Sequence, residues 1–131
     1  MNTKKTIVAV LVSFLISNIL ATLWYSIMDD ANFVAFRREE MNYLGLMLNH
    51  LVFAGLFVHF FPSYYSSSPG TGRSLIYGTL MAALMFLPSG MVVRSIWTVD
   101  FNSIFFLNTL AHMVIGAIMG FVLMKIYLFK K

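Results

Sequence analysis

The chain has 131 residues, of which 60% are hydrophobic and only 11% are charged. Soluble domains average roughly 25% charged and 45–50% apolar residues, and a domain this small could not bury so much apolar surface. The composition therefore excludes an ordinary water-soluble protein and favours a single transmembrane domain over residues 1–131. The absence of cysteine excludes disulfides, thiolate metal sites and cysteine nucleophiles.

Four long apolar runs follow one another along the chain, at residues 7–28, 43–61, 74–97 and 101–129. A helix needs about 20 residues to cross the hydrocarbon core of a bilayer, and each run is about that long or longer. The runs lack the apolar–polar alternation of a membrane barrel. The first is longer than the apolar core of a signal peptide, so we expect it to be retained. The sequence predicts an all-α integral membrane four-helix bundle.

The three connections between these runs differ in character. Residues 29–42 are polar and charged, with apolar residues spaced as in a short helix lying in the membrane interface. Residues 62–73 are rich in Ser, Gly and Pro, which predicts a flexible loop. Residues 98–100 are so few that the third and fourth helices are expected to form an antiparallel hairpin.

The basic residues predict an orientation, because Lys and Arg are enriched on the cytoplasmic side of membrane proteins. Both termini and the second connection share one side, which carries six basic residues and no acid; the other side carries three basic residues and all five acids. Aromatic residues typical of the interface fall at the outer boundary: Trp24, Tyr25, Tyr43 and Trp97. This predicts a multi-pass protein of the bacterial inner membrane with both termini in the cytoplasm. The net charge of +4 is too dispersed to favour a nucleic-acid partner.

Small residues predict where the helices pack, because lipid supplies no hydrophobic drive between helices. Ser13, Ser17 and Ala21 recur every four residues in the first helix, and Gly116 and Gly120 form a GxxxG pattern in the fourth. Gly78 and Ala82 have the same spacing in the third helix. These residues are expected to pack inside one bundle, and dimerisation is the alternative.

The third helix contains Pro88 and Gly90. Pro88 lacks an amide proton and clashes with the preceding turn, so a kink is expected here. The alternative is a broken helix that lines a binding site, as in transporters, but no matching break occurs elsewhere in the sequence.

Few polar residues lie within the runs, and none is a carboxylate, which disfavours a proton pump. Helical depth allows a polar layer in the outer half of the bundle, formed by Asn18, Asn49 or His50, Asn108 and His112. His59 would face the opposite side of its helix from His50.

Two interpretations of this layer remain open. Neutral side chains could form interhelical hydrogen bonds. Alternatively, His50 and His112 could hold a cofactor or ligand, for example a haem between two axial imidazoles, a quinone or a lipid. No metal site is expected, because only two histidines converge and no acid accompanies them.

The chain also resembles the small four-helix bacterial membrane proteins grouped as DUF1761, a family of unknown function. The resemblance lies in Ala21-Thr22-Leu23-Trp24-Tyr25-Ser26 at the end of the first helix and in Asn108-Thr109-Leu110-Ala111-His112 of the fourth. It implies a four-helix fold and an envelope location, but no activity.

These features favour a small, non-enzymatic membrane protein whose partners are the lipid bilayer and either other membrane chains or itself. It would be an accessory or structural subunit of a membrane complex, or a self-associating bundle. A haem-, quinone- or lipid-binding module is the alternative, and a transporter is less favoured. An enzyme is disfavoured because no nucleophile–base pair or metal cluster occurs at a usable spacing.

Overall fold

The computed structural model describes residues 3–28, 42–66, 70–96 and 103–128. Its helices are α1 (Thr3–Ile27), α3 (Tyr43–Ser66), α4 (Thr71–Ile96) and α5 (Ser103–Leu128). Each contains a segment long and apolar enough to cross a membrane. The predicted all-helical architecture with four long apolar helices is therefore confirmed for the described residues. The expected interfacial helix at 29–42 lies outside them except for Asn42, and so does the short third connection.

The second expected connection is shorter than predicted. α3 continues past Pro62 to Ser66, and α4 begins at Thr71, so the prediction of a loop over residues 62–73 is wrong at both ends. Pro62 removes one backbone hydrogen bond but does not end the helix, because aromatic side chains on both sides of it pack into the bundle. Phe61 and Tyr65 are stacked at 5.0 Å between ring centroids, and both are buried.

α4 is likewise helical on both sides of Pro88. The Ser89 hydroxyl donates its one proton in a bifurcated hydrogen bond to the carbonyl oxygens of Met85 and Phe86, at 2.7 and 3.2 Å. Serine commonly bonds backward to its own helix in this way. Gly90 lies against the Phe105 ring of α5. The alternative of a broken helix is therefore wrong.

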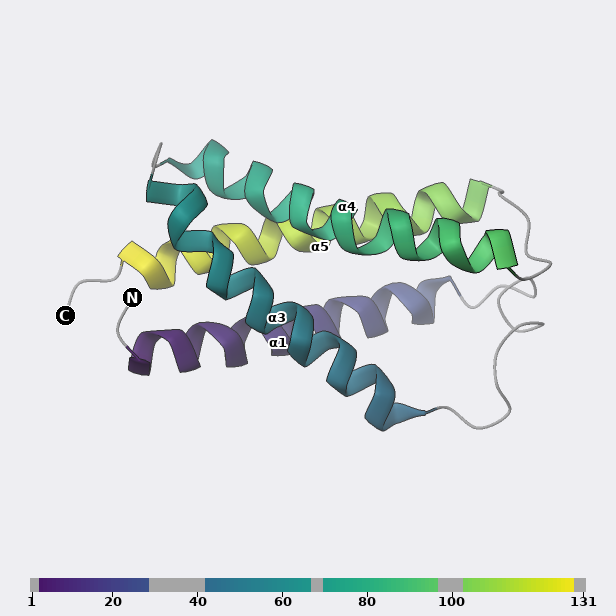
Figure 1. Cartoon of the computed structure of the whole chain (residues 1–131), viewed down its shortest axis with the longest axis horizontal. Coiled ribbons are helices and arrows are strands. Elements are labelled where there is room, and N and C mark those ends of the chain that lie inside the picture. The colour runs from purple at the N-terminus through teal and green to yellow at the C-terminus, as the bar shows by residue number, and fades with distance from the viewer. Residues whose placement is uncertain (1–2, 29–41, 67–69, 97–102, 129–131) are drawn as a thin grey trace.

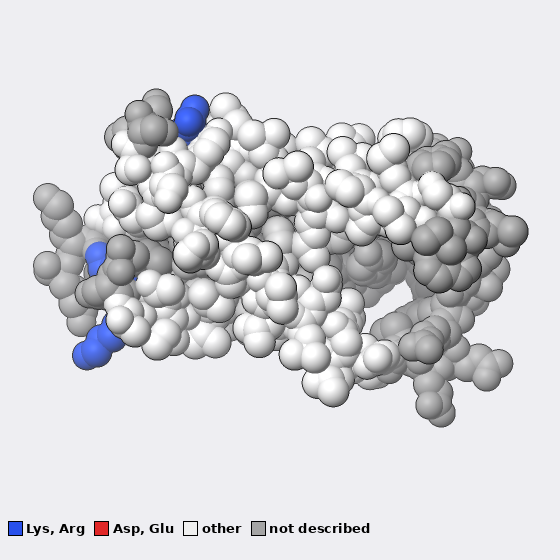
Figure 2. Space-filling model, viewed as in Figure 1, with Lys and Arg blue, Asp and Glu red and all other residues white. Residues whose placement is uncertain are grey.

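The helices form one bundle in which α4 and α5 run antiparallel and share the most extensive contact (Figure 1). α1 packs against α5 and α3, whereas α3 crosses the bundle obliquely and touches α4 least among these pairs. The start of α1, the end of α3, the start of α4 and the end of α5 lie at one end. The described Lys and Arg side chains that are visible in Figure 2 lie at this end.

The α4–α5 contact is made by backbone. A Cβ on Gly116 would meet the Gly78 carbonyl oxygen and lie 2.7 Å from the Ala82 Cβ, and a Cβ on Gly120 would meet the Ser74 carbonyl oxygen. Small residues every four positions on both helices therefore allow the two axes to approach closely. The two glycines of the GxxxG pattern therefore pack against α4 of the same chain. On α1, Ser13, Ser17 and Ala21 are buried as well.

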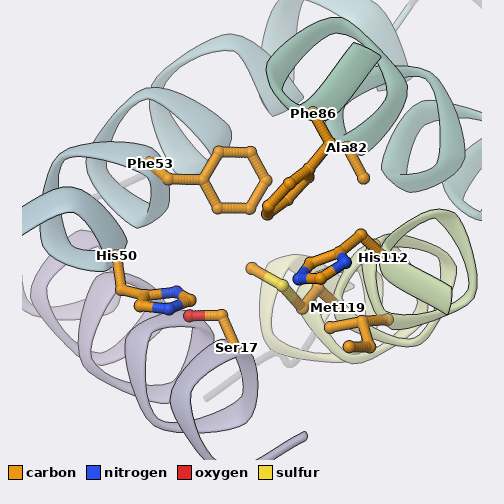
Figure 3. Close-up of a pocket in the computed structure, with 9 residues that line it drawn as sticks. Ser17, His50, Phe53, Ala82, Phe86, His112 and Met119 are labelled. Atoms are coloured by element: carbon orange, nitrogen blue, oxygen red, sulfur yellow. The ribbon is translucent and has the colours of Figure 1, made fainter. Parts of the chain in front are cut away.

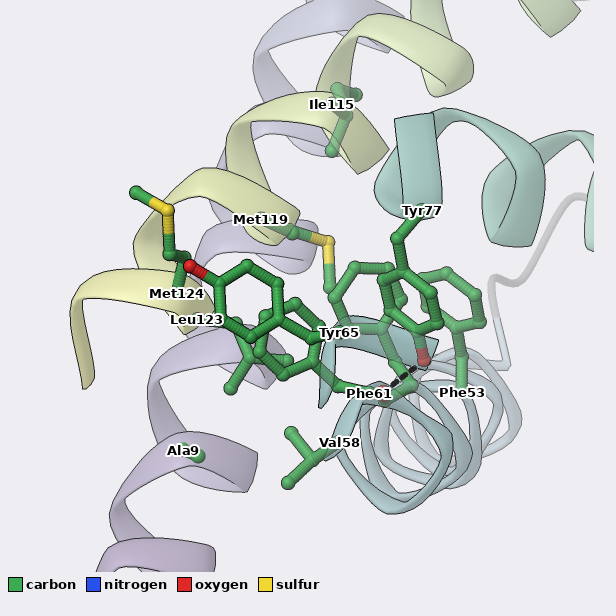
Figure 4. Packing of buried hydrophobic residues seen from close by; sticks show 11 residues of the cluster. Ala9, Phe53, Val58, Phe61, Tyr65, Tyr77, Ile115, Met119, Leu123 and Met124 are labelled. Atoms are coloured by element: carbon green, nitrogen blue, oxygen red, sulfur yellow. Dashed lines mark hydrogen bonds between the residues drawn. The ribbon is translucent and has the colours of Figure 1, made fainter. Parts of the chain in front are cut away.

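The core toward the basic end is aromatic (Figure 4). Tyr77 of α4 packs edge-on against Phe57 and Phe61 of α3, with ring centroids 5.0 and 5.2 Å apart. Its hydroxyl donates a hydrogen bond to the Phe57 carbonyl oxygen. Edge-to-face rings and a satisfied hydroxyl let tyrosine serve as a core residue, so this cluster attaches the second half of α3 to α4.

Candidate functional site: a pocket between two buried histidines

Side chains that are far apart in the sequence form hydrogen bonds between α1 and α5. The Trp24 indole N–H donates a 2.9 Å hydrogen bond to the Asn108 side-chain oxygen. The Asn108 side chain also hydrogen-bonds Tyr25. One turn later on α5, His112 Nδ1 lies 2.8 Å from the Asn108 carbonyl oxygen. If Nδ1 carries the proton, His112 donates this bond and Nε2 is left as an acceptor.

His112 is enclosed by aromatic rings. The Phe86 ring of α4 lies 3.7 Å from it between centroids, tilted by 35°, and the Tyr25 ring lies 5.8 Å away. His112 is only 3% exposed. Its polar bond to Asn108 and its aromatic contacts together hold the imidazole in one orientation between α1, α4 and α5.

His50 of α3 is buried to a similar degree but lacks such support. It is 5% exposed, and among the described residues its ring makes no hydrogen bond. The Ser17 hydroxyl of α1 points toward the ring (Figure 3), but it donates its own hydrogen bond to the Phe14 carbonyl oxygen at 3.0 Å. His50 is thus the buried imidazole with free hydrogen-bonding capacity.

The two histidines face a shared pocket to which all four described helices contribute (Figure 3). Its lining is mostly apolar apart from one serine and the two imidazoles: Ser17, His50, Phe53, Ala82, Phe86, His112, Ile115, Gly116 and Met119. The cavity volume is about 10 Å³, about the space that one water molecule needs. Pockets for drug-sized ligands are far larger, roughly 300–1,000 Å³.

This pocket suits a very small polar guest better than a cofactor. A haem or quinone would need more space than is present, because Phe86 and Met119 reach into the region between the two imidazoles. Within the described ranges, no group of three or more His, Asp or Glu side chains could hold a metal ion. The pair can donate and accept hydrogen bonds. The Ser17 hydroxyl beside it is bonded to the Phe14 carbonyl oxygen, and the residues that line the pocket include no carboxylate.

The other members of the expected polar layer lie elsewhere. The Asn18 amide donates a 2.8 Å hydrogen bond to the Phe14 carbonyl oxygen of its own helix. Asn49 and His59 are exposed on α3. The structure therefore brings together His50, His112 and Asn108 at or near the pocket, and leaves Asn18 and Asn49 out of it.

Sequence reasoning missed the aromatic half of the site. Trp24 was assigned to the membrane interface, and Phe53, Phe86 and Met119 were not singled out, because an apolar residue in an apolar helix gives no signal of its own. The Trp24–Asn108 bond does join the two segments in which the resemblance to DUF1761 was noted, and that resemblance stays a prediction. No family model, curated protein or solved structure matches the chain.

Proposed function

We propose that this chain is a non-enzymatic integral membrane protein that assembles with other membrane-embedded chains through the outer face of α3. Four helices of membrane-spanning length and composition support the membrane setting. The gathering of described Lys and Arg side chains at one end, together with the positions of the acids in the sequence, supports an orientation with both termini in the cytoplasm.

One observation carries the assembly role: α3 exposes Asn49 and His59 within its membrane-spanning segment. Neither side chain makes a hydrogen bond in the described part of the chain. The His59 ring has only an edge-on contact with Phe60 on the same helix, at 5.1 Å between centroids. An amide or imidazole without a partner is costly in hydrocarbon, so these groups are expected to be satisfied by another chain.

Three exposed hydroxyls on α1 and α4 are satisfied locally. The hydroxyls of Ser26, Ser89 and Ser95 each donate a hydrogen bond to a carbonyl oxygen of their own helix, at 2.7–2.8 Å. Asn18 and His112 bond a carbonyl oxygen of their own helix in the same way, whereas the side chains of Asn49 and His59 do not. The contrast makes α3 the interaction helix of the bundle.

Photocrosslinking in native membranes tests this role. A photoreactive amino acid replaces Leu56 on the outer face of α3 or, as a matched control, Leu110 on α5, which are 49% and 57% exposed. We expect discrete protein adducts from position 56 and only lipid adducts from position 110. Absence of protein adducts from position 56 in membranes would overturn the proposal.

The chain contains no cysteine, so single introduced cysteines can test its orientation in the membrane. Tyr43→Cys and Gly72→Cys place single thiols at opposite ends of the bundle. Labelling of intact cells with a membrane-impermeant maleimide should modify position 43, and position 72 should react only after permeabilisation. The reverse pattern would contradict the orientation.

A further inference from the structure

The outer face of α3 follows a regular repeat. Gly45, Asn49, Val52, Leu56 and His59 are spaced alternately by four and three residues, and all five are exposed. This spacing averages 3.5 residues, which is the period of two helices that wrap around each other with a left-handed twist. We call these five residues the α3 seam.

The α3 seam lies on the opposite side of the helix from the residues that α3 buries in its own bundle. At about 100° per residue, the buried positions from His50 to Tyr65 cluster on one side, and the seam lies roughly 150° away from them. α3 therefore presents two separate faces, one for this chain and one unoccupied.

The polar members of the seam favour one occupant. Copies of a chain in one membrane share an orientation, so Asn49 of each copy lies at the same depth. A two-fold axis along the bilayer normal places each residue beside its equivalent. An amide has both donors and an acceptor, and so does a neutral imidazole. A second copy therefore places an amide beside Asn49 and an imidazole beside His59. These two residues lie about 15 Å apart along the helix.

We propose that two copies of this chain form a parallel dimer through the α3 seam, with Asn49 paired to Asn49 and His59 to His59. The inference rests on the proposed function, because it names the partner of the same face. In heptad terms Asn49 occupies an a position, where asparagine favours a parallel pair in fixed register.

The geometry leaves room for this pairing. The first half of α3 diverges from α4 and α5 (Figure 1), and every residue from Tyr43 to Asn49 is exposed. The atoms nearest to a Cβ placed on Gly45 belong to the Asn42 side chain, whose oxygen caps the helix by accepting a 2.9 Å hydrogen bond from the Gly45 amide.

Single cysteines test which chain lies against the seam. In the full-length protein in membranes, Val52→Cys places a thiol on the seam, and Leu51→Cys places one on a neighbouring exposed face as a matched control. Mild oxidation is expected to give a disulfide-linked dimer from position 52 and little from position 51. Equal yields from both positions would indicate random collision and overturn the dimer.

Asparagine variants test the pairing itself. Asn49→Leu is expected to weaken dimerisation by roughly 3- to 20-fold, the range found for hydrogen bonds between membrane helices, as measured by energy transfer between labelled copies in liposomes. Asn18→Leu, which removes an amide bonded to its own helix, should leave the dimer unchanged. No difference between the two variants would overturn the role of Asn49.

The outcomes separate the two proposals. If photocrosslinking at position 56 captures a different protein and position 52 gives no self-linked dimer, the second copy is overturned and assembly through α3 stands. If neither position captures any protein in native membranes, both proposals fail.

Discussion

Trp24 and Asn108 are separated by 84 positions in the sequence, yet a 2.9 Å hydrogen bond joins their side chains. Together with the bond between Asn108 and Tyr25, this bond fixes how far α1 is shifted along α5. It also orients Asn108 beside the pocket, one turn before His112. The Trp24–Asn108 bond therefore couples the relative position of α1 and α5 to the geometry of the pocket.

Asn108→Leu should destabilise the bundle, because the Trp24 indole N–H loses its acceptor. We expect the free energy of unfolding to fall by about 0.6–1.7 kcal/mol, measured by SDS titration of the purified protein. Asn18→Leu serves as the matched control, since its amide bonds only its own helix. An equal loss in both variants would contradict a specific interhelical bond.

Gly116→Ala should be more damaging than its small size suggests. The added methyl group would overlap the Gly78 carbonyl oxygen and approach Ala82, so the helices must separate. We expect a loss of about 1–3 kcal/mol in the free energy of unfolding. Gly55→Ala is the control, because no atom lies within 4 Å of its added Cβ, and alanine favours the helix by about 1 kcal/mol. A stable Gly116→Ala protein would refute the backbone contact.

Tyr77→Phe isolates the hydroxyl in the aromatic core. The variant keeps the ring contacts with Phe57 and Phe61 and removes only the bond to the Phe57 carbonyl oxygen. The expected cost is about 0.5–1.5 kcal/mol in the free energy of unfolding. Tyr43→Phe, at a residue that is 62% exposed, should cost nothing measurable. A neutral Tyr77→Phe variant would show that the ring alone matters.

The two pocket histidines should respond differently to the same substitution. His112→Leu removes a hydrogen-bonded imidazole enclosed by Phe86 and Tyr25. His50→Leu removes an imidazole with no hydrogen-bond partner among the described residues, and replaces it with an apolar group of similar size. SDS titration should therefore show a greater loss of stability for His112→Leu. A greater loss for His50→Leu would indicate that His50 holds a guest in the pocket.

Haemin offers a direct test of the cofactor hypothesis. Because the pocket is small and Phe86 and Met119 fill the region between the imidazoles, we expect no Soret band specific to the protein after haemin is added. The His50→Ala, His112→Ala double variant provides the baseline. A band that disappears in the double variant would establish bis-histidine ligation and contradict the small-guest interpretation.

The sequence predicted what depends on composition and spacing. Four helices followed from the length of the apolar runs. It could not predict the helical continuation of α3 past Pro62, because that depends on contacts made by Phe61 and Tyr65 in the assembled core. The Ser, Gly and Pro residues of this segment favour a loop locally, but the burial of Phe61 and Tyr65 in the core keeps its first part helical.

The site was predictable only in part for a similar reason. Helical depth placed His50 and His112 at comparable levels, and they do line one pocket. Depth carries no information on rotation about the helix axis, so Asn49, one residue before His50, was an alternative candidate for the same layer but faces outward. One residue turns the side chain by about 100°, and only the packed helices determine which neighbour points inward.

The uneven attachment of α3 has a consequence for how mutations would combine. The contact between α4 and α5 is the most extensive in the described bundle, whereas the α3 seam faces away from the residues that α3 buries. Substitutions more than about 7–10 Å apart with no shared partners act additively. Gly116→Ala and Asn49→Leu should therefore combine without coupling, the first lowering the yield of folded chains and the second the affinity between them. Selection could then adjust the strength of assembly without altering the fold.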